Sequence, residues 1–168
     1  MEKRFLGKLE VTPIGMGCMG LSHGYGNIPD EKYSIEAIKK AYEFGCNFFD
    51  TAEGYGPNLL RENYGHNEKM VGKALKEVRD KVIIATKFML TKEEAEKGIE
   101  KSIREHLKLS LERLQTNYVD LYYLHRINRQ VSLEEIAKVM GILIKEGLIK
   151  GWGLSQVSKE TIERVLIK

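Results

Sequence analysis

The sequence predicts an α/β protein of about five β-α units. From residue 30 onward, short apolar runs alternate with longer amphipathic stretches. The short runs are apolar on both faces, which is typical of strands in a parallel sheet that is covered on each side. The chain has 168 residues, enough for one domain with a sizeable core. We expect a single domain, in which residues 1–13 form a hairpin and residues 14–168 form the β-α units.

Strands are expected at the apolar runs. Residues 4–12 are expected to fold as a small β-hairpin, with Gly7 and Lys8 at its turn. The strands of the main sheet are expected at residues 14–19, 46–49, 82–85, 119–124 and 149–154.

Five helices are expected between and after these strands. Most begin at a residue whose side chain can accept hydrogen bonds from the first helical turn. These N-cap residues are Asp30, Asn67, Ser132 and Ser158. Glu135 completes a capping box with Ser132, and the helix after Ser158 is expected to reach the end of the chain. The remaining helix is indicated by apolar residues four or three apart between Ile99 and Leu114.

Composition favours a cytoplasmic globular protein without a nucleic-acid or membrane partner. The net charge is +3, and lysines and acidic residues are intermixed along the chain. No apolar run is long enough to span a bilayer, and no signal-peptide core follows the first residues. The two cysteines, Cys18 and Cys46, lie in apolar stretches without metal-ligand spacing. We therefore expect both to be reduced.

Alternating β-α units are compatible with an open doubly wound sheet or with a closed barrel. Open sheets that bind dinucleotides usually carry the phosphate fingerprint G-x-G-x-x-G after the first strand. Residues 15–20 read GMGCMG instead, and these glycines suit a tight turn at least as well as a phosphate. The missing fingerprint favours the barrel.

A polar residue directly follows four of the expected strands. These residues are Asp50, Lys87, His125 and Ser155. Each one alone has a simple structural explanation, such as a helix cap, a solvated lysine or a hydrogen-bonded histidine. The carboxyl ends of parallel strands lie on one face, however, and barrel enzymes build their active sites there. The repetition therefore predicts a catalytic rim.

The segments around these residues resemble the aldo-keto reductase family. Residues 48–56, FFDTAEGYG, are similar to its signature, in which a strand ends in Asp-Thr-Ala and Tyr-Gly follows. Four further segments match in the same order: residues 67–75, 84–87, 118–126 and 147–155. The resemblance spans essentially the whole chain. It implies part of an eight-unit (β/α)8, or TIM, barrel with a hairpin across its bottom.

The resemblance also implies NAD(P)H-dependent reduction of an aldehyde or ketone, and the reverse oxidation of an alcohol. The cofactor would be NADP(H), with NAD(H) as the alternative. The matching catalytic residues are Asp50, Tyr55, Lys87 and His125. Tyr55 would act as general acid/base, Lys87 held by Asp50 would stabilise the phenolate, and His125 would orient and polarise the carbonyl.

Cofactor contacts are implied by family position only. The backbone at residues 17–19 would lie beside the cofactor, and a serine after the fifth strand would approach the nicotinamide amide. Gln156 stands where many relatives have asparagine. The implied cofactor-binding residues are Gly17, Cys18, Met19, Asp50, Ser155 and Gln156.

The expected strands end at residues 50, 87, 125 and 155, so the 168 residues hold about five β-α units. Eight units of this length need about 250 residues or more. We expect such a truncated barrel to bind cofactor weakly and to turn over little or not at all. Its open sheet edges would favour self-association. The alternative function is a non-catalytic half-barrel that associates with itself or another protein. A metal-dependent hydrolase using Asp50 and His125 is a remote third, because the sequence has no dense ligand set, and we expect no metal.

Overall fold

A parallel sheet of five strands organises the chain in the computed structural model, which describes residues 2–24, 26–58 and 60–166. The strands follow one another in chain order, and each pairs in parallel with the next. They are β3 (Met16–Gly17), β4 (Phe48–Asp50), β5 (Ile83–Phe88), β6 (Val119–Leu124) and β7 (Ile149–Leu154). Sequential parallel strands joined by right-handed crossovers place all their helices on the same side of the sheet.

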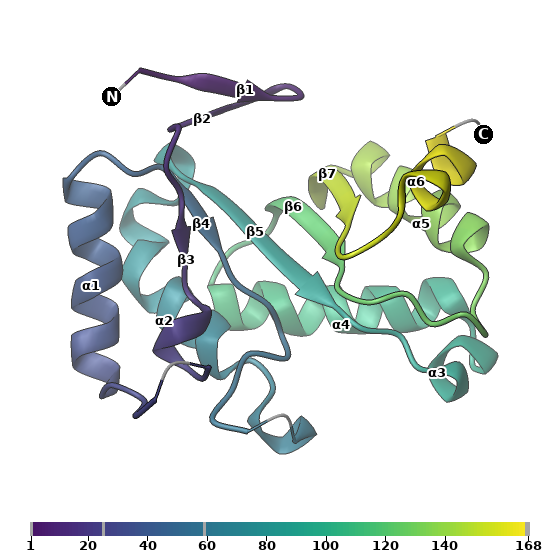
Figure 1. The fold of residues 1–168 in the computed structure, drawn as a ribbon, viewed down its shortest axis with the longest axis horizontal. Helices are drawn as coiled ribbons and strands as arrows, with labels where there is room; N and C mark the ends of the chain where they lie inside the picture. Colours follow the sequence, from purple (N-terminus) through teal and green to yellow (C-terminus); the bar gives the residue numbers. More distant parts are fainter. Residues whose placement is uncertain (1, 25, 59, 167–168) are drawn as a thin grey trace.

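The helices form one layer behind the sheet in Figure 1 and leave its other face open. Those that follow strands are α1 (Glu31–Glu43), α2 (His66–Leu75), α4 (Ile99–Leu114), α5 (Leu133–Lys145) and α6 (Lys159–Leu166). Shorter helical segments are η1 (Met19–Leu21), η2 (Arg61–Asn63), η3 (Lys76–Lys81) and α3 (Lys92–Glu96). Successive long helices pack against one another in chain order, as in the wall of a barrel. The expected α/β architecture is confirmed.

The hairpin expected at residues 4–12 is confirmed. Strand β1 (Arg4–Leu6) pairs antiparallel with β2 (Leu9–Val11), and Gly7 takes a φ of 61° at the turn. The hairpin lies at the end of the sheet where the strands begin (Figure 1). Asn47 attaches it there, because its side chain accepts from the Thr12 amide (2.7 Å) and donates to the Glu10 carbonyl (3.0 Å).

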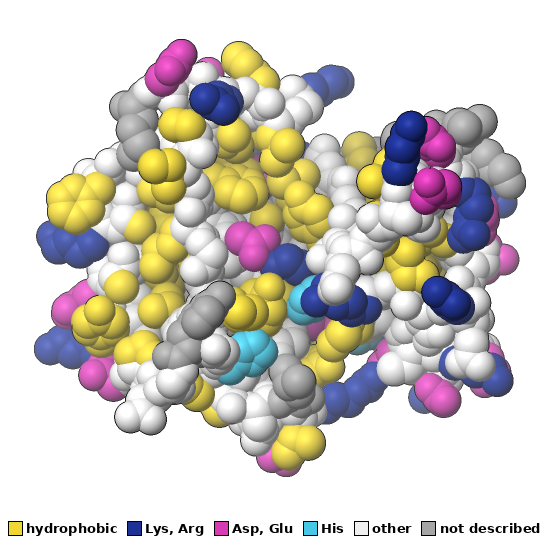
Figure 2. Space-filling model, in the orientation of Figure 1, with side chains coloured by type: hydrophobic (Ala, Val, Ile, Leu, Met, Phe, Trp, Pro, Cys, Tyr) yellow, Lys and Arg dark blue, Asp and Glu magenta, His cyan; other side chains and the backbone are white. Residues whose placement is uncertain are grey.

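The core lies between the sheet and the helices. Strand residues that point toward the helices, such as Phe49, Ile84 and Tyr122, are fully buried. Residues on the opposite face, such as Phe48 and Tyr123, are only partly buried. A broad hydrophobic area is therefore visible on the open face of the molecule (Figure 2).

Three of the expected helix starts agree with the structure. Asp30 caps α1 by accepting from the Tyr33 amide (2.8 Å), and Ser132 caps α5 by accepting from the Glu135 amide (3.2 Å). Ser158 accepts from the amide of Thr161 at the start of α6 (3.4 Å). The last helix is described as far as residue 166, so its expected end at residue 168 lies outside the described residues.

The expected N-cap role of Asn67 is wrong. The N-cap of helix α2 lies two residues earlier, at Gly65, which takes a left-handed φ of 82°. Asn67 lies in the first turn and is fully buried, so its amide is used for contacts described below. The sequence analysis also missed α3, which begins with a capping box between Thr91 and Glu94.

Two strand boundaries differ from expectation in ways that matter for the site. Strand β3 pairs only at residues 16 and 17 of the expected 14–19. Strand β5 continues to Phe88, so Lys87 lies inside the strand and not after it. The backbone of Lys87 is consequently fixed by pairing with β6, opposite Tyr123.

Within the described residues, no helix is long and apolar enough to cross a membrane.

The close approach of α2 and α4 can be tested at Gly72. A Cβ at this position would lie 2.5 Å from the Arg113 carbonyl oxygen and 2.7 Å from the Leu114 Cα, both backbone atoms. We expect Gly72→Ala to destabilise the protein by about 1–3 kcal/mol in urea unfolding, because the helices must separate.

The matched control is Gly141→Ala in α5, where a Cβ would meet no heavy atom within 4 Å. Helix propensity alone operates there, and we expect stabilisation by about 0.5–1 kcal/mol. If both variants shift stability in the same direction, the packing argument at Gly72 fails.

Candidate active site

The structure brings together the four residues expected to be catalytic. Asp50 ends β4, Tyr55 lies in the loop that follows, Lys87 lies near the end of β5, and His125 directly follows β6. Side chains alternate between the two faces of a strand, and these residues occupy the open face at the carboxyl end of the sheet. Figure 2 shows acidic, basic and histidine side chains side by side at the centre of this face, next to the hydrophobic area.

The ammonium group of Lys87 is the centre of the cluster. Its Nζ lies 2.5 Å from Asp50 Oδ1, 2.8 Å from the Thr51 carbonyl oxygen and 3.0 Å from Tyr55 Oη. These three acceptors use the three N–H donors of the ammonium group. The lysine residue is only 8% exposed, so its position is determined by these partners and not by solvent.

Two imidazole rings lie close to the phenol ring of Tyr55. The ring is 9% exposed, and its centroid is 5.5 Å from that of His125, with the two rings nearly perpendicular. The ring of His23, from the loop after β3, lies 5.8 Å away. His23 was not predicted, because no motif around it indicated a contact with the tyrosine. The arrangement holds the phenol hydroxyl beside both Lys87 and the open face.

His125 is a neutral imidazole at physiological pH. Burial, the nearby positive charge of Lys87 and that of Arg126 lower its pKa from 6.5 to about 4. Its amide donates to the Phe88 carbonyl oxygen (2.8 Å), which fixes the backbone beside β5. Its Nδ1 is buried and has no hydrogen-bond partner in the described part of the chain. A neutral ring offers one N–H donor, and which nitrogen carries it depends on the tautomer.

Glu53 anchors the loop that carries Tyr55, a role that the sequence analysis missed. The residue is 1% exposed, and its carboxylate accepts from the Met89 amide (2.9 Å) and contacts His106 Nδ1 (2.8 Å). Its own amide donates to the Lys87 carbonyl oxygen, and its carbonyl accepts from Gly65. Glu53 thus ties the loop to β5 and α4.

His106 connects this anchor to the surface. It lies on α4 between Glu53 and Glu94, whose Oε2 is 3.6 Å from His106 Nε2. Although burial acts to lower the pKa of His106, the two carboxylates raise it above 6.5 overall. Arg61 pairs with Glu94 on the outer side (2.8 Å). The four side chains form a continuous charged chain from the loop to the surface.

The amide of Asn67 holds the other side of the loop. Its Oδ1 accepts from Thr51 Oγ1 (2.6 Å), and its Nδ2 donates to the Cys18 carbonyl (2.8 Å) and to Ser22 Oγ (2.7 Å). All of these residues are buried. Thr51, whose carbonyl binds Lys87, is thereby joined to α2 and to the segment after β3.

The residues expected to bind cofactor lie at two separate edges of the sheet. Gly17 pairs with Asp50 at the β3 edge, and a Cβ on Gly17 would meet no heavy atom within 4 Å. Ser155 and Gln156 follow β7 at the opposite edge, where Ser155 Oγ accepts from Arg126 Nη1 (3.2 Å) and Gln156 takes a φ of 57°. The open face lies between the two groups.

Cys18 and Met19 follow Gly17 at the β3 edge. The side chain of Cys18 is completely buried, and burial is the main cause that raises the pKa of its thiol to about 12. Only the backbone of Cys18 can therefore face a ligand. Met19 is partly buried and begins η1.

Among the residues that the structure describes, no group of three or more His, Cys, Asp or Glu side chains could hold a metal ion.

Comparison with known proteins identifies the family of this chain. The aldo/keto reductase family model matches residues 13–168. A curated relative, "Probable aldo-keto reductase 1" from Glycine max, is 40% identical in an alignment 160 residues long, which covers 92% of this chain and 44% of that protein.

Solved structures give the same result. The holo form of aldo-keto reductase AKR11C1 from Bacillus halodurans is 34% identical, with a TM-score of 0.81 over 99% of this chain and 54% of that one. An aldo-keto reductase from Klebsiella pneumoniae, solved in complex with NADPH, is 27% identical, with a TM-score of 0.77 over 95% of this chain and 50% of that one. This chain therefore spans about half the length of the relatives it matches, and it belongs to the aldo/keto reductase family.

Proposed function

We propose that this protein is an oxidoreductase that reduces an aldehyde or ketone to an alcohol with NADP(H), NAD(H) being the alternative cofactor. The observation that carries the proposal is the hydrogen bond between Tyr55 Oη and Lys87 Nζ (3.0 Å) beside the ring of His125. A phenol paired with an ammonium group on an open face can donate and recover a proton. The Klebsiella pneumoniae relative solved with NADPH supports the choice of cofactor.

The residues present fit a dinucleotide on the open face. The space beside Gly17, into which a side chain would project, is open, so a ligand can approach the backbone of residues 17–19 closely. We propose that this backbone and Asp50 hold the cofactor at one edge, and that the side chains of Ser155 and Gln156 hold it at the other. When bound, the cofactor supplies or accepts the hydride.

The side chains of this protein bind the carbonyl oxygen and donate the proton that it needs. The substrate's carbonyl oxygen accepts hydrogen bonds from Tyr55 Oη and from neutral His125. As the oxygen becomes an alkoxide, it takes the Tyr55 proton, and the alcohol is complete. Lys87 then stabilises the phenolate that remains. Asp50 and the Thr51 carbonyl keep Lys87 in place.

The sheet is open beyond β3 and β7 in the described residues. We therefore propose that the 168-residue chain binds the cofactor weakly and turns over slowly. The same observation favours a second candidate function, a non-catalytic half-barrel that associates with itself or another protein through these edges. Sedimentation of the purified chain separates the two, because a monomer with measurable turnover contradicts the second candidate.

A reducing compartment suits the two free cysteines, Cys18 and Cys46, which are both buried. We propose that the protein acts in the cytoplasm.

Removing the proton donor should abolish turnover. We expect Tyr55→Phe to lower kcat by about 10²- to 10⁴-fold, the range typical of general acid–base catalysis. The measurement is NADPH consumption with 4-nitrobenzaldehyde at high protein concentration, with NADPH binding followed by fluorescence. Tyr33→Phe, at a tyrosine that is 60% exposed on α1, is the control. Equal rates in the two variants would contradict the role of Tyr55.

The neutral state of His125 can be measured without turnover. We expect its ring resonances to titrate near pH 4 in NMR spectra, because burial and two cations oppose protonation. Titration at pH 6.5 or above would show that the ring is charged during much of the working range and would remove its role as a neutral donor.

The lowered pKa also predicts a pH dependence of stability. As the pH falls from 6.5 to about 4, the unfolded chain binds a proton at His125 before the folded chain does. The free energy of unfolding therefore decreases through this residue over that window. We expect His125→Asn to lose less stability than the wild type between pH 7 and pH 4.5 in urea unfolding. An equal loss in both proteins argues against the shift.

A further inference from the structure

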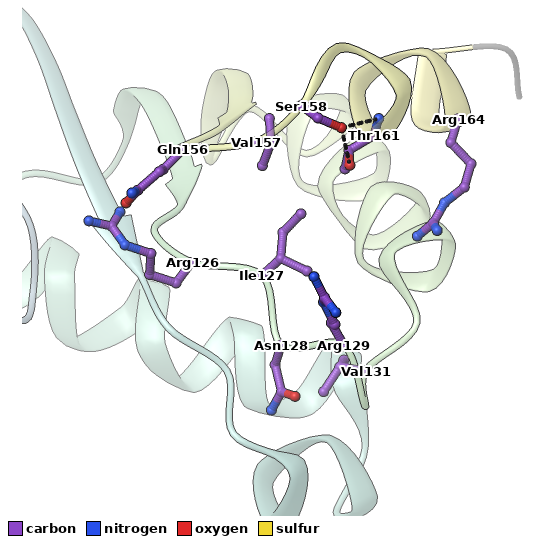
Figure 3. A pocket seen from close by; sticks show the side chains of 10 residues that line it. All are labelled: Arg126, Ile127, Asn128, Arg129, Val131, Gln156, Val157, Ser158, Thr161 and Arg164. Atoms are coloured by element: carbon purple, nitrogen blue, oxygen red, sulfur yellow. Dashed lines mark hydrogen bonds between the residues drawn. The ribbon is translucent and has the colours of Figure 1, made fainter.

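A cavity of about 580 Å³ lies at the carboxyl end of β6 and β7. Its walls are the loop from β6 to α5, the loop from β7 to α6, and the first turns of α6 (Figure 3). The first loop continues directly from His125, and the second continues from Ser155. The two loops therefore run from the candidate active site into the cavity wall, and Gln156, proposed above to hold the cofactor, lines the cavity, whereas none of the four catalytic residues does.

The lining of this cavity is strongly basic. Arg126, Arg129 and Arg164 contribute to it, and its lining residues include no Asp or Glu. Figure 3 shows Arg126 beside Gln156 at one end, Arg164 at the other, and Arg129 between them. Three guanidinium groups around one cavity create a positive potential that favours an anion.

The three arginines differ in how far their charge is already compensated. Arg164 Nε pairs with Glu134 Oε1 outside the cavity lining (2.9 Å). Arg126 Nη1 donates to the His125 carbonyl (2.5 Å) and to Ser155 Oγ (3.2 Å), which are neutral oxygens. Arg129 makes no ion pair with any carboxylate of the described residues. Arg126 and Arg129 thus line the cavity without a carboxylate partner among the described residues, and Figure 3 shows the guanidinium group of Arg126 turned toward Gln156.

The loop that presents Arg129 is held in a defined conformation. Asn128 Oδ1 accepts from the Gln130 amide (3.0 Å), and the Asn128 backbone carbonyl accepts from the Val131 amide (3.1 Å). Its Nδ2 also reaches the Leu90 carbonyl (3.4 Å) after β5. A guanidinium group on a fixed turn loses less entropy when it binds than one on a mobile loop.

We propose that this cavity is a subsite for the anionic group, a carboxylate or a phosphate, of a small substrate whose carbonyl lies at His125. Guanidinium groups recognise both anions through paired N–H donors. Ile127 and Val157, on the two loops, provide apolar contacts for the part of the ligand between its two ends. Acidic aldehydes or ketones are thus the substrate class. The carbonyl part of this inference rests on the proposed function, whereas the anion site does not.

The anion site is tested by binding. Inorganic phosphate is titrated into the ¹⁵N-labelled chain at constant ionic strength, which removes general screening. We expect chemical-shift changes in the backbone amides of residues 126–131 and 156–161. We expect the dissociation constant for phosphate to be at least about tenfold larger in Arg129→Met. The control is Lys39→Met, which removes an exposed positive charge from α1. Unchanged affinity in Arg129→Met, or shifts confined to other regions, would overturn the anion site.

The substrate assignment is tested with two matched aldehydes, 4-carboxybenzaldehyde and its uncharged methyl ester. We expect the ratio of their kcat/KM values, acid over ester, to fall about 10- to 100-fold in Arg129→Met and not in Lys39→Met. A constant ratio together with weaker NADPH binding would assign the charge to the cofactor and overturn the substrate subsite. Absence of turnover in the wild type would count against the proposed function, while the phosphate titration would still decide the anion site.

Discussion

The buried ammonium group of Lys87 must be surrounded by polar partners, and the arrangement of the candidate active site follows from this requirement. A charge taken out of water is costly unless partners surround it. Here Asp50, the Thr51 carbonyl and Tyr55 supply those partners, all from β4 and the loop after it. Only one partner carries a full negative charge, and its side chain is 32% exposed. The remaining stabilisation comes from a carbonyl dipole and the phenol oxygen. The same contacts place the ammonium group next to the hydroxyl that gives up its proton in the proposed reaction.

That arrangement depends on the loop between Asp50 and Tyr55 keeping one conformation. Two buried networks hold it from opposite sides. Glu53 joins the loop to β5 and α4, and Asn67 joins Thr51 to the segment after β3. Both use side chains whose hydrogen bonds are satisfied, as a buried polar group requires. The loop is therefore positioned by the scaffold, and the phenol hydroxyl needs little reorganisation to reach a substrate.

Local patterns predicted the elements well and the contacts between distant segments poorly. Apolar runs located every strand of the sheet, and Asp30 and Ser132 marked helix starts correctly. Asn67 has the same capping chemistry, but tertiary hydrogen bonds use its amide instead, which no local pattern could indicate. Asp50, Lys87 and His125 were predicted because each is a polar residue at or next to the end of an expected strand, whereas Tyr55 was identified only by the resemblance of residues 48–56 to the family signature. Glu53 stands inside the same motif, yet its role depends on His106, which lies 53 positions later in the chain.

The candidate active site and the basic cavity next to it both contain positively charged side chains. Lys87 and Arg126 both lower the pKa of His125, although burial contributes most. Arg126 also lines the basic cavity next to it. The positive field that adds to the effect of burial on His125 also repels cations and attracts anions at this end of the sheet. A neutral imidazole can donate a hydrogen bond to a carbonyl oxygen. A protonated imidazolium would be a stronger acid than the phenol and would compete with Tyr55 as the proton donor. The proposed role of His125 at the carbonyl and the proposed preference for an acidic substrate therefore both draw on the positive charge at this end of the sheet.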